Sequence, residues 1–167
     1  GSGQVEVDAA KGGKTLLRAR HIVIATGARS REIPNVTVDG DRIWNYRHAL
    51  APATLPASLL VIGAGAIGME FASLYHSLGT KVTVAELQDR VLPMEDEEVS
   101  AFVAAAFSKQ GISIRTGAAV AAVERAGDAL QVSIRSGDTT DRLEVSPVLV
   151  AVGVTGNTEN LGLEQTA

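Results

Sequence analysis

One stretch, residues 59–86 with the sequence LLVIGAGAIGMEFASLYHSLGTKVTVAE, constrains the fold more than any other part of the chain. It contains an apolar run, a glycine turn, a helical pattern that ends at Gly79, and a second apolar run that ends in an acid. The order strand, turn, helix, strand predicts two parallel strands joined by a helix. The predicted fold is therefore α/β, with a Rossmann-like parallel sheet and flanking helices.

The turn has the spacing of a dinucleotide-binding loop. In such a loop the first glycine permits a tight turn, the second lets a pyrophosphate approach the backbone, and the third allows the helix to pack closely on the strand. The N–H groups that open the helix would face the phosphates. The candidate cofactor-binding residues here are Gly63, Ala64, Gly65, Ala66, Ile67 and Gly68. The alternative is a turn that needs glycine only for packing.

Two acids accompany this loop. Glu86 ends the second strand, 23 positions after Gly63, and matches the acid that accepts hydrogen bonds from the adenosine ribose. Its carboxylate would repel a 2′-phosphate, and the nearest arginine is Arg90, so NAD is favoured over NADP. The alternative is a solvated acid at a strand end. Glu70 lies in the first helical turn, and the residues alone favour two interpretations equally. One is a favourable contact with the helix dipole, and the other is a position near the nicotinamide.

The remaining pattern completes the predicted architecture. Residues 4–26 predict a β-hairpin whose end, HIVIATG, has the composition of a strand buried on both faces. Residues 29–56 predict a connection with a short helix at 45–50, and residues 118–146 predict a three-stranded antiparallel meander. PVLVAVGV predicts a last buried strand, followed by a polar tail.

Two helices are expected to bury an apolar row each. A helix at 66–78 and a second from Asp96 to Gly111 have apolar residues at helical spacing. The predicted rows are Ile67, Phe71, Leu74 and Leu78 in the first, and Val99, Phe102, Val103 and Phe107 in the second.

Composition excludes several classes of function. The 167 residues contain no cysteine, so the chain has no disulfide, thiolate metal site or thiol chemistry of its own. A net charge of −4 gives no reason to expect a nucleic-acid partner. No apolar run is long enough to span a membrane and no signal peptide is visible, so a cytoplasmic location is predicted. The three histidines have no metal-binding spacing, and neither a metal ligand nor a catalytic residue is assigned.

Four stretches carry a resemblance to a known family. IATGARSREIP, IGAGAIGMEFASLYHSLGTKVTVAEL, RVLPMEDEEVSAFVAAAFSKQGI and VAVGVTGNTENLGLE resemble the central part of the dihydrolipoamide dehydrogenases, within the flavoprotein disulfide reductase family. The resemblance implies an oxidoreductase that uses FAD and NAD, with dihydrolipoamide as substrate, homodimeric within a 2-oxoacid dehydrogenase complex. It also implies that the FAD glycine motif and redox disulfide precede residue 1, that the acid/base dyad follows Ala167, and that the chain alone is inactive.

The resemblance assigns domains and further sites. Residues 1–50 would be a partial FAD-domain segment and linker, 51–155 the NAD-binding domain, and 156–167 the start of the return to the FAD domain, with the remaining FAD and dimerisation domains as partners. Thr26 and Gly27 match a turn against the flavin nucleotide, and Glu70 matches an acid near the junction of nicotinamide and flavin. Val120 matches an apolar residue at the adenine, and Gly153 a glycine beside the cofactor.

One departure from the family pattern stands at 153–158, where GVTGNT lacks the arginine of GRxPNT. Two alternatives to dihydrolipoamide dehydrogenase remain. The chain could belong to another flavoprotein disulfide reductase or an NADH oxidase relative, or it could be a non-catalytic nucleotide-binding module.

Overall fold

A computed structural model describes residues 3–165, which form two compact units. One unit runs from Ser30 to Val154, and the other combines the described residues up to Arg29 with those from Thr155 onward. The larger unit contains the glycine turn and all three predicted helices, including the short one at 45–50. The predicted domain boundaries at 50 and 155 stay a prediction.

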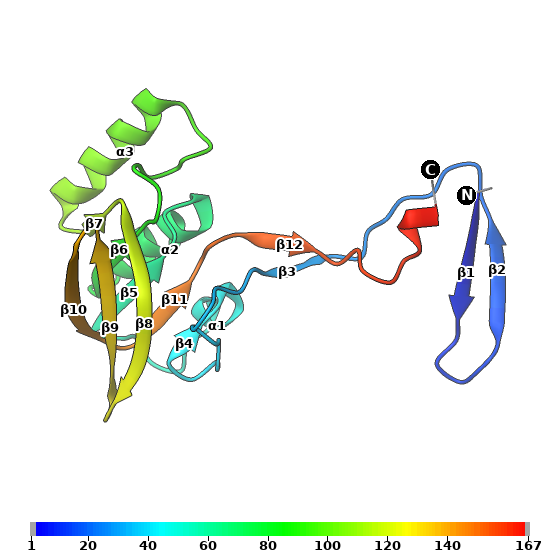
Figure 1. The fold of residues 1–167 in the computed structure, drawn as a ribbon, viewed down its shortest axis with the longest axis horizontal. Coiled ribbons are helices and arrows are strands. Elements are labelled where there is room, and N and C mark those ends of the chain that lie inside the picture. Colours follow the sequence, from blue (N-terminus) through cyan, green and yellow to red (C-terminus); the bar gives the residue numbers. More distant parts are fainter. Residues whose placement is uncertain (1–2, 166–167) are drawn as a thin grey trace. The chain divides into compact units, whose positions relative to one another are not determined.

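A five-stranded parallel sheet forms the centre of the larger unit (Figure 1). Its order is β4-β11-β5-β6-β7, and every neighbouring pair runs parallel. The strands are β4 (Ile43–Trp44), β5 (Ser58–Ile62), β6 (Lys81–Ala85), β7 (Ser113–Arg115) and β11 (Val148–Val150). The sequence predicted this sheet, except for β4, which is too short to show a pattern.

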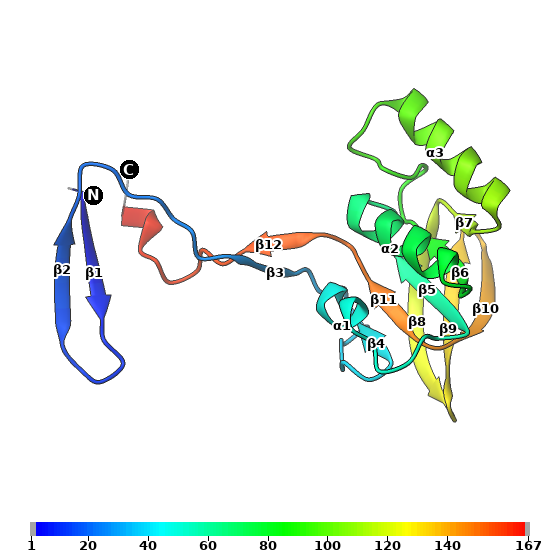
Figure 2. The same ribbon diagram turned by 180° about the vertical axis from the view of Figure 1, so that it is seen from behind.

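Three helices and an antiparallel sheet cover the two faces of this parallel sheet (Figures 1 and 2). The helices are α1 (Tyr46–Leu50), α2 (Ala66–Ser77) and α3 (Glu97–Gln110). The second sheet is the predicted meander, with strands β8 (Ala118–Ala126), β9 (Ala129–Ser136) and β10 (Thr139–Val145) in the order β10-β9-β8. The predicted α/β class with a three-stranded meander is confirmed.

Strand β5 shows why these layers form. Leu59 and Val61 lie in the core under the helices, whereas Leu60 and Ile62 lie in the core under the meander, and all four side chains are buried. Successive residues of a strand point to opposite faces, so a continuous apolar run needs a layer on each side.

The predicted apolar face of α2 is wrong in part. Leu74 and Leu78 are 47% and 55% exposed, whereas the buried residues are Gly68, Met69, Phe71, Ala72 and Tyr75. The glycine turn sets this orientation because Gly68 must lie against the end of β5, and residues three, four and seven positions further share its face.

The face of α3 differs from the prediction for a similar reason. Val99 is 47% and Phe102 74% exposed, while Val103 and Phe107 pack against the core as predicted. The only buried α3 residue among those described is Ser100, whose hydroxyl donates to the Leu92 carbonyl at 3.1 Å. This contact rotates the helix so that the row starting at Ser100 faces inward. Both predicted helix ends are confirmed: Asp96 caps the start, and Gly111 ends the helix with a φ of +109°.

The smaller unit contains the predicted hairpin, formed by β1 (Gln4–Asp8) and β2 (Lys14–Arg18). Strands β3 (Ala28–Ser30) and β12 (Val154–Gly156) pair with each other, and the chain passes from one unit to the other within each of these two strands. A short 3₁₀ helix spans Leu163–Gln165.

The predicted buried strand HIVIATG is wrong for this chain. Residues 22–27 are not in a strand, and Ile22, Val23 and Ile24 are 48%, 86% and 48% exposed. A strand buried on both faces needs neighbours on its edges and layers above and below. Among residues 3–165 no strand pairs with this segment, so its apolar side chains stay exposed.

Candidate functional site

The glycine turn lies at the carboxyl end of β5, in the middle of the parallel sheet. From β5 the chain continues to β6 and β7 on one side of the sheet and returns to β11 on the other. Ligands of open α/β sheets bind in the crevice where the strand order reverses in this way. The turn therefore occupies the position at which a dinucleotide binds in doubly wound folds.

The three glycines of the turn meet different constraints. Gly63 has a φ of +101°, and a β-carbon there would lie 2.6 Å from the Ala151 carbonyl oxygen. A β-carbon at Gly68 would lie 2.0 Å from the Gly63 carbonyl oxygen. At Gly65, by contrast, φ is −71° and a β-carbon would meet nothing within 4 Å. Backbone conformation or packing requires the first and third glycines, but neither of them requires the second.

Glu86 is buried, although its carboxylate ends a strand. The residue is 8% exposed, so the interpretation as a solvated strand-end acid is wrong. One carboxylate oxygen, Oε2, accepts the backbone N–H of Ala64 at 2.6 Å, and Oε1 accepts the backbone N–H of Gln88 at 2.8 Å. The Glu86 carboxylate is therefore hydrogen-bonded directly to the middle residue of the Gly63-Ala64-Gly65 turn.

Three further candidates lie in the same unit. Glu70 is exposed near the start of α2, and Gly153 is exposed with a φ of +107° after β11. Val120 is half-buried and packs against the core under the meander, beside an irregularity between Val120 and Ala122 in the β8–β9 pairing. The roles assigned to these residues by resemblance stay predictions.

Thr26 and Gly27 lie in the smaller unit, where Asn157 forms a hydrogen bond with each of them. The Thr26 hydroxyl donates to the Asn157 carbonyl at 2.5 Å, and the Asn157 N–H donates to the Gly27 carbonyl at 2.9 Å. Nearby, Arg29 forms an ion pair with Glu159 at 2.5 Å. The Arg29 hydrogen bond lowers the pKa of the Glu159 carboxyl to about 2. These contacts join two chain segments that are about 130 residues apart in sequence.

The comparisons with known proteins decide the family. The model of the pyridine nucleotide-disulphide oxidoreductases matches residues 1–167. The chain belongs to this family. It is 46% identical over 99% of its length to a dihydrolipoyl dehydrogenase of Zymomonas mobilis, and 44% identical over 91% to one of Rhizobium etli. The matched segments are 36% and 32% of those proteins, so the chain spans about a third of their length.

The solved structures show the same relationship. LpdA from Mycobacterium tuberculosis has a TM-score of 0.82 and 34% identity over 96% of this chain and 34% of its own. The flavoprotein disulfide reductase RclA from Escherichia coli has a TM-score of 0.75 and 29% identity over 98% of this chain and 36% of its own. Members of the pyridine nucleotide-disulphide oxidoreductase family thus share both the sequence pattern and the fold of this chain.

One contact of the turn was not predicted from the sequence. The Leu92 backbone N–H donates to the Ala64 carbonyl at 2.8 Å, and Leu92 has a φ of +45°. Leucine rarely adopts this left-handed conformation, so no feature of the sequence marks it. The segment after Glu86 therefore returns to the glycine turn and contacts it a second time.

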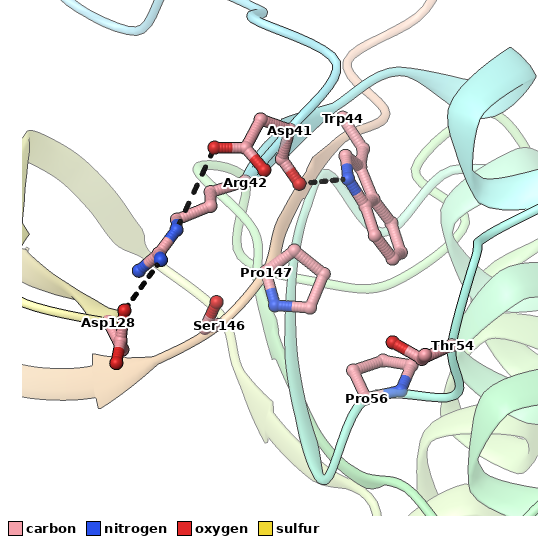
Figure 3. Close-up of a pocket in the computed structure, with 8 residues that line it drawn as sticks. All are labelled: Asp41, Arg42, Trp44, Thr54, Pro56, Asp128, Ser146 and Pro147. Carbon is pink, nitrogen blue, oxygen red and sulfur yellow. Dashed lines mark hydrogen bonds and ion pairs between the residues drawn. The ribbon is translucent and has the colours of Figure 1, made fainter.

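The pocket in Figure 3 lies at the opposite end of the sheet from the glycine turn. It has a volume of about 230 Å³ and adjoins Pro56 and Pro147, which precede β5 and β11. Its one cation is already paired with both of its carboxylates, since Arg42 lies 3.1 Å from Asp128 and 3.8 Å from Asp41. The pocket has no geometric relation to the dinucleotide motif of the family.

Residues 3–165 contain neither a cluster of potential metal ligands nor a helix that could cross a membrane. No group of three histidine or acidic side chains there is arranged to hold a metal ion. No helix in that part of the chain has the length and apolar character needed to cross a bilayer.

Proposed function

We propose that the unit of residues 30–154 binds NAD(H) at the glycine turn that joins β5 to α2. In the whole enzyme it would present the nicotinamide to a flavin. The overall reaction would be oxidation of dihydrolipoamide to lipoamide, with two electrons and one proton reducing NAD⁺ to NADH and the second proton released.

The observation that carries this proposal is the open space at Gly65. Gly63 and Gly68 are required by backbone conformation and packing, whereas a side chain at Gly65 would meet no protein atom within 4 Å. A phosphate group that must approach the backbone supplies the missing reason for glycine. The first N–H groups of α2 have no acceptor within the helix, so they are available to such a phosphate.

The position of Glu86 supports NAD over NADP. Its carboxylate lies at the carboxyl end of β6, beside the turn, and is bonded to the Ala64 N–H. Four lone-pair positions are available on a carboxylate. Two accept backbone N–H groups here, which leaves two for ribose hydroxyls. A 2′-phosphate would place its negative charge against this buried carboxylate.

The rest of the proposed enzyme adds chemistry that these residues lack. Dihydrolipoamide would reduce a redox disulfide to a dithiol, and a bound FAD would supply the chemistry that links the two electrons of this dithiol to NAD⁺. Thr26 and Gly27 would lie against the flavin nucleotide. The share of this chain is to bind and orient NAD. The remaining FAD and dimerisation domains would complete a homodimer that serves a 2-oxoacid dehydrogenase complex.

A different substrate is the second candidate, because relatives of similar identity have different names. A leghemoglobin reductase of Vigna unguiculata is 38% identical over 97% of the chain. In our proposal the second substrate of the enzyme is bound by parts outside this unit, so the NAD site described here fits either enzyme.

A titration with NADH and NADPH, followed by nucleotide fluorescence, tests the proposed function. We expect NADH to bind at least about tenfold more tightly than NADPH, a difference of about 1.4 kcal/mol. Equal binding of the two nucleotides would contradict the role of Glu86, and binding of neither would overturn the proposal. An assay of the purified chain with FAD, dihydrolipoamide and NAD should show no turnover, since the chain contains no cysteine.

A further inference from the structure

We infer that Glu86 is also a positioning residue, which holds the glycine turn in its binding conformation through the backbone N–H of Ala64. This inference rests on the proposed NAD site and adds a second role to the acid. The same carboxylate that faces the ribose would set the shape of the loop that faces the pyrophosphate.

The backbone of Ala64 is held on both sides. Its N–H donates to Glu86 Oε2 at 2.6 Å, and its carbonyl accepts the Leu92 N–H at 2.8 Å. The residue is completely buried. On the preceding residue, the Gly63 N–H donates to the Ala85 carbonyl at 2.8 Å. The middle of the turn is therefore fixed by the end of β6 and by the segment that follows it.

The second contact depends on a strained residue. Leu92 is in the left-handed region with a φ of +45°, which is costly for leucine. Its carbonyl accepts the Ser100 hydroxyl at 3.1 Å and the Glu95 N–H at 2.9 Å. Ser100 is 2% exposed. Ser100 thus acts on the turn through Leu92, from a position that touches no ligand in our proposal.

This arrangement assigns the donors of the loop. The Ala64 N–H is used by Glu86, so the pyrophosphate would bind the N–H groups of Gly65, Ala66 and Ile67, which open α2 and lack intrahelical acceptors. A buried polar group that loses its partner must find another or shift. Without the Glu86 carboxylate, the Ala64 N–H would lose its acceptor and the loop would leave the conformation that presents these donors.

Two ligands separate positioning from direct contact. NADH offers the adenosine ribose hydroxyls, whereas an NADH analogue with a 2′,3′-dideoxy adenosine ribose offers none. If Glu86 only bound the hydroxyls, Glu86→Ala would leave affinity for the analogue unchanged. We expect Glu86→Ala to weaken analogue binding at least fivefold and NADH binding more than that. Glu86→Gln keeps an acceptor for the Ala64 N–H, so it should largely restore affinity for the analogue.

Two further variants complete the test. Ser100→Ala should lower the affinity for both ligands by the same few-fold factor, because Ser100 acts through Leu92 alone. Glu124→Ala removes an exposed acid of the meander and serves as the matched control, with unchanged affinities. Unchanged analogue affinity in Glu86→Ala would overturn the positioning role.

Hydrogen exchange in the ligand-free protein tests the contact independently of binding. In Glu86→Ala the Ala64 amide should exchange at least tenfold faster than in the unmodified chain, while the Val84 amide in β6 should keep its protection. Equal exchange at Ala64 would overturn the inference, even if NADH binds as proposed. Failure of the unmodified chain to bind NADH would overturn the proposed function, and this exchange measurement would still decide whether Glu86 holds the turn.

Discussion

Alanine at Gly65 is expected to separate ligand binding from folding. Gly65 caps α2 with a φ of −71° and a ψ of −179°, a conformation that any residue adopts, and a β-carbon there would meet nothing within 4 Å. Alanine is a poorer helix cap than glycine by up to about 1 kcal/mol. The reduced entropy of the unfolded chain offsets about 0.4–1 kcal/mol of this. The net change in the free energy of unfolding should therefore stay within about 0.5 kcal/mol.

The effect on nucleotide binding should be larger. The added methyl group would occupy the space that we assign to the pyrophosphate, and forcing an extra methyl group into a packed contact costs about 1–3 kcal/mol. This corresponds to a loss of roughly 5- to 150-fold in affinity for NADH. For a chain of this size, 1 kcal/mol shifts the melting temperature by about 2–4 °C, so Tm should change by no more than about 2 °C.

Gly68→Ala and Gly156→Ala are the matched controls, each measured by thermal unfolding and NADH fluorescence. At Gly68 a β-carbon would lie 2.0 Å from the Gly63 carbonyl oxygen, against an ordinary separation of about 3.5–4.0 Å. That variant should lose about 1–3 kcal/mol of stability. Gly156→Ala, with 3.7 Å to its nearest neighbour, should change neither property. Unchanged NADH affinity in Gly65→Ala, or a Tm as low as that of Gly68→Ala, would refute the assignment of this space to a phosphate.

Three more perturbations test other parts of the structure. Tyr75→Phe removes the hydroxyl that donates to the buried Ala49 carbonyl at 2.7 Å and should cost about 1–2 kcal/mol in chemical denaturation; an unchanged midpoint would contradict that role. The pKa of Glu159 is lowered to about 2 from its ordinary 4.5, so the stabilisation by its pair with Arg29 is complete above pH 4.5 and lost as pH falls toward 2. An NMR titration should place this pKa near 2 and Arg29→Ala should raise it; a value near 4.5 in the unmodified chain would contradict the pair. Val23→Ser should reduce self-association in sedimentation experiments, since Val23 is 86% exposed in an apolar segment; a clean monomer of the unmodified chain would argue against association through this segment.

Local patterns predicted the elements well. The β-branched runs before Gly63 and Glu86 indicated buried parallel strands, and Asp96 and Gly111 marked the ends of α3, because capping depends on neighbouring backbone groups alone. The face that each helix buries was harder to predict. Leu74 and Phe102 fit an apolar periodicity, but α2 is oriented by Gly68 and α3 by the Ser100 hydroxyl. These are contacts with residues just before each helix, Gly63 and Leu92, and the periodicity within a helix does not contain them.

The candidate site, too, was predictable from the sequence only in its local features. The spacing of the glycines and of Glu86 indicated a dinucleotide loop and its acid, because the loop is short and its requirements are local. The burial of Glu86 and its bond to Ala64 could not be predicted, since they depend on where β6 ends relative to the turn. The segment 22–27 shows the reverse case, in which a pattern typical of a buried strand lies exposed because no described strand pairs with it.

By itself, the sequence determined the order of strand, turn and helix around Gly63-Ala64-Gly65, since glycine conformations and apolar alternation act within a few residues. Only the tertiary structure showed at which glycine a β-carbon would meet no protein atom, and which groups hydrogen-bond to the turn. Ala64 meets Glu86 and Leu92 across 22 and 28 positions of sequence, and such contacts follow from the packing of whole elements rather than from local preference.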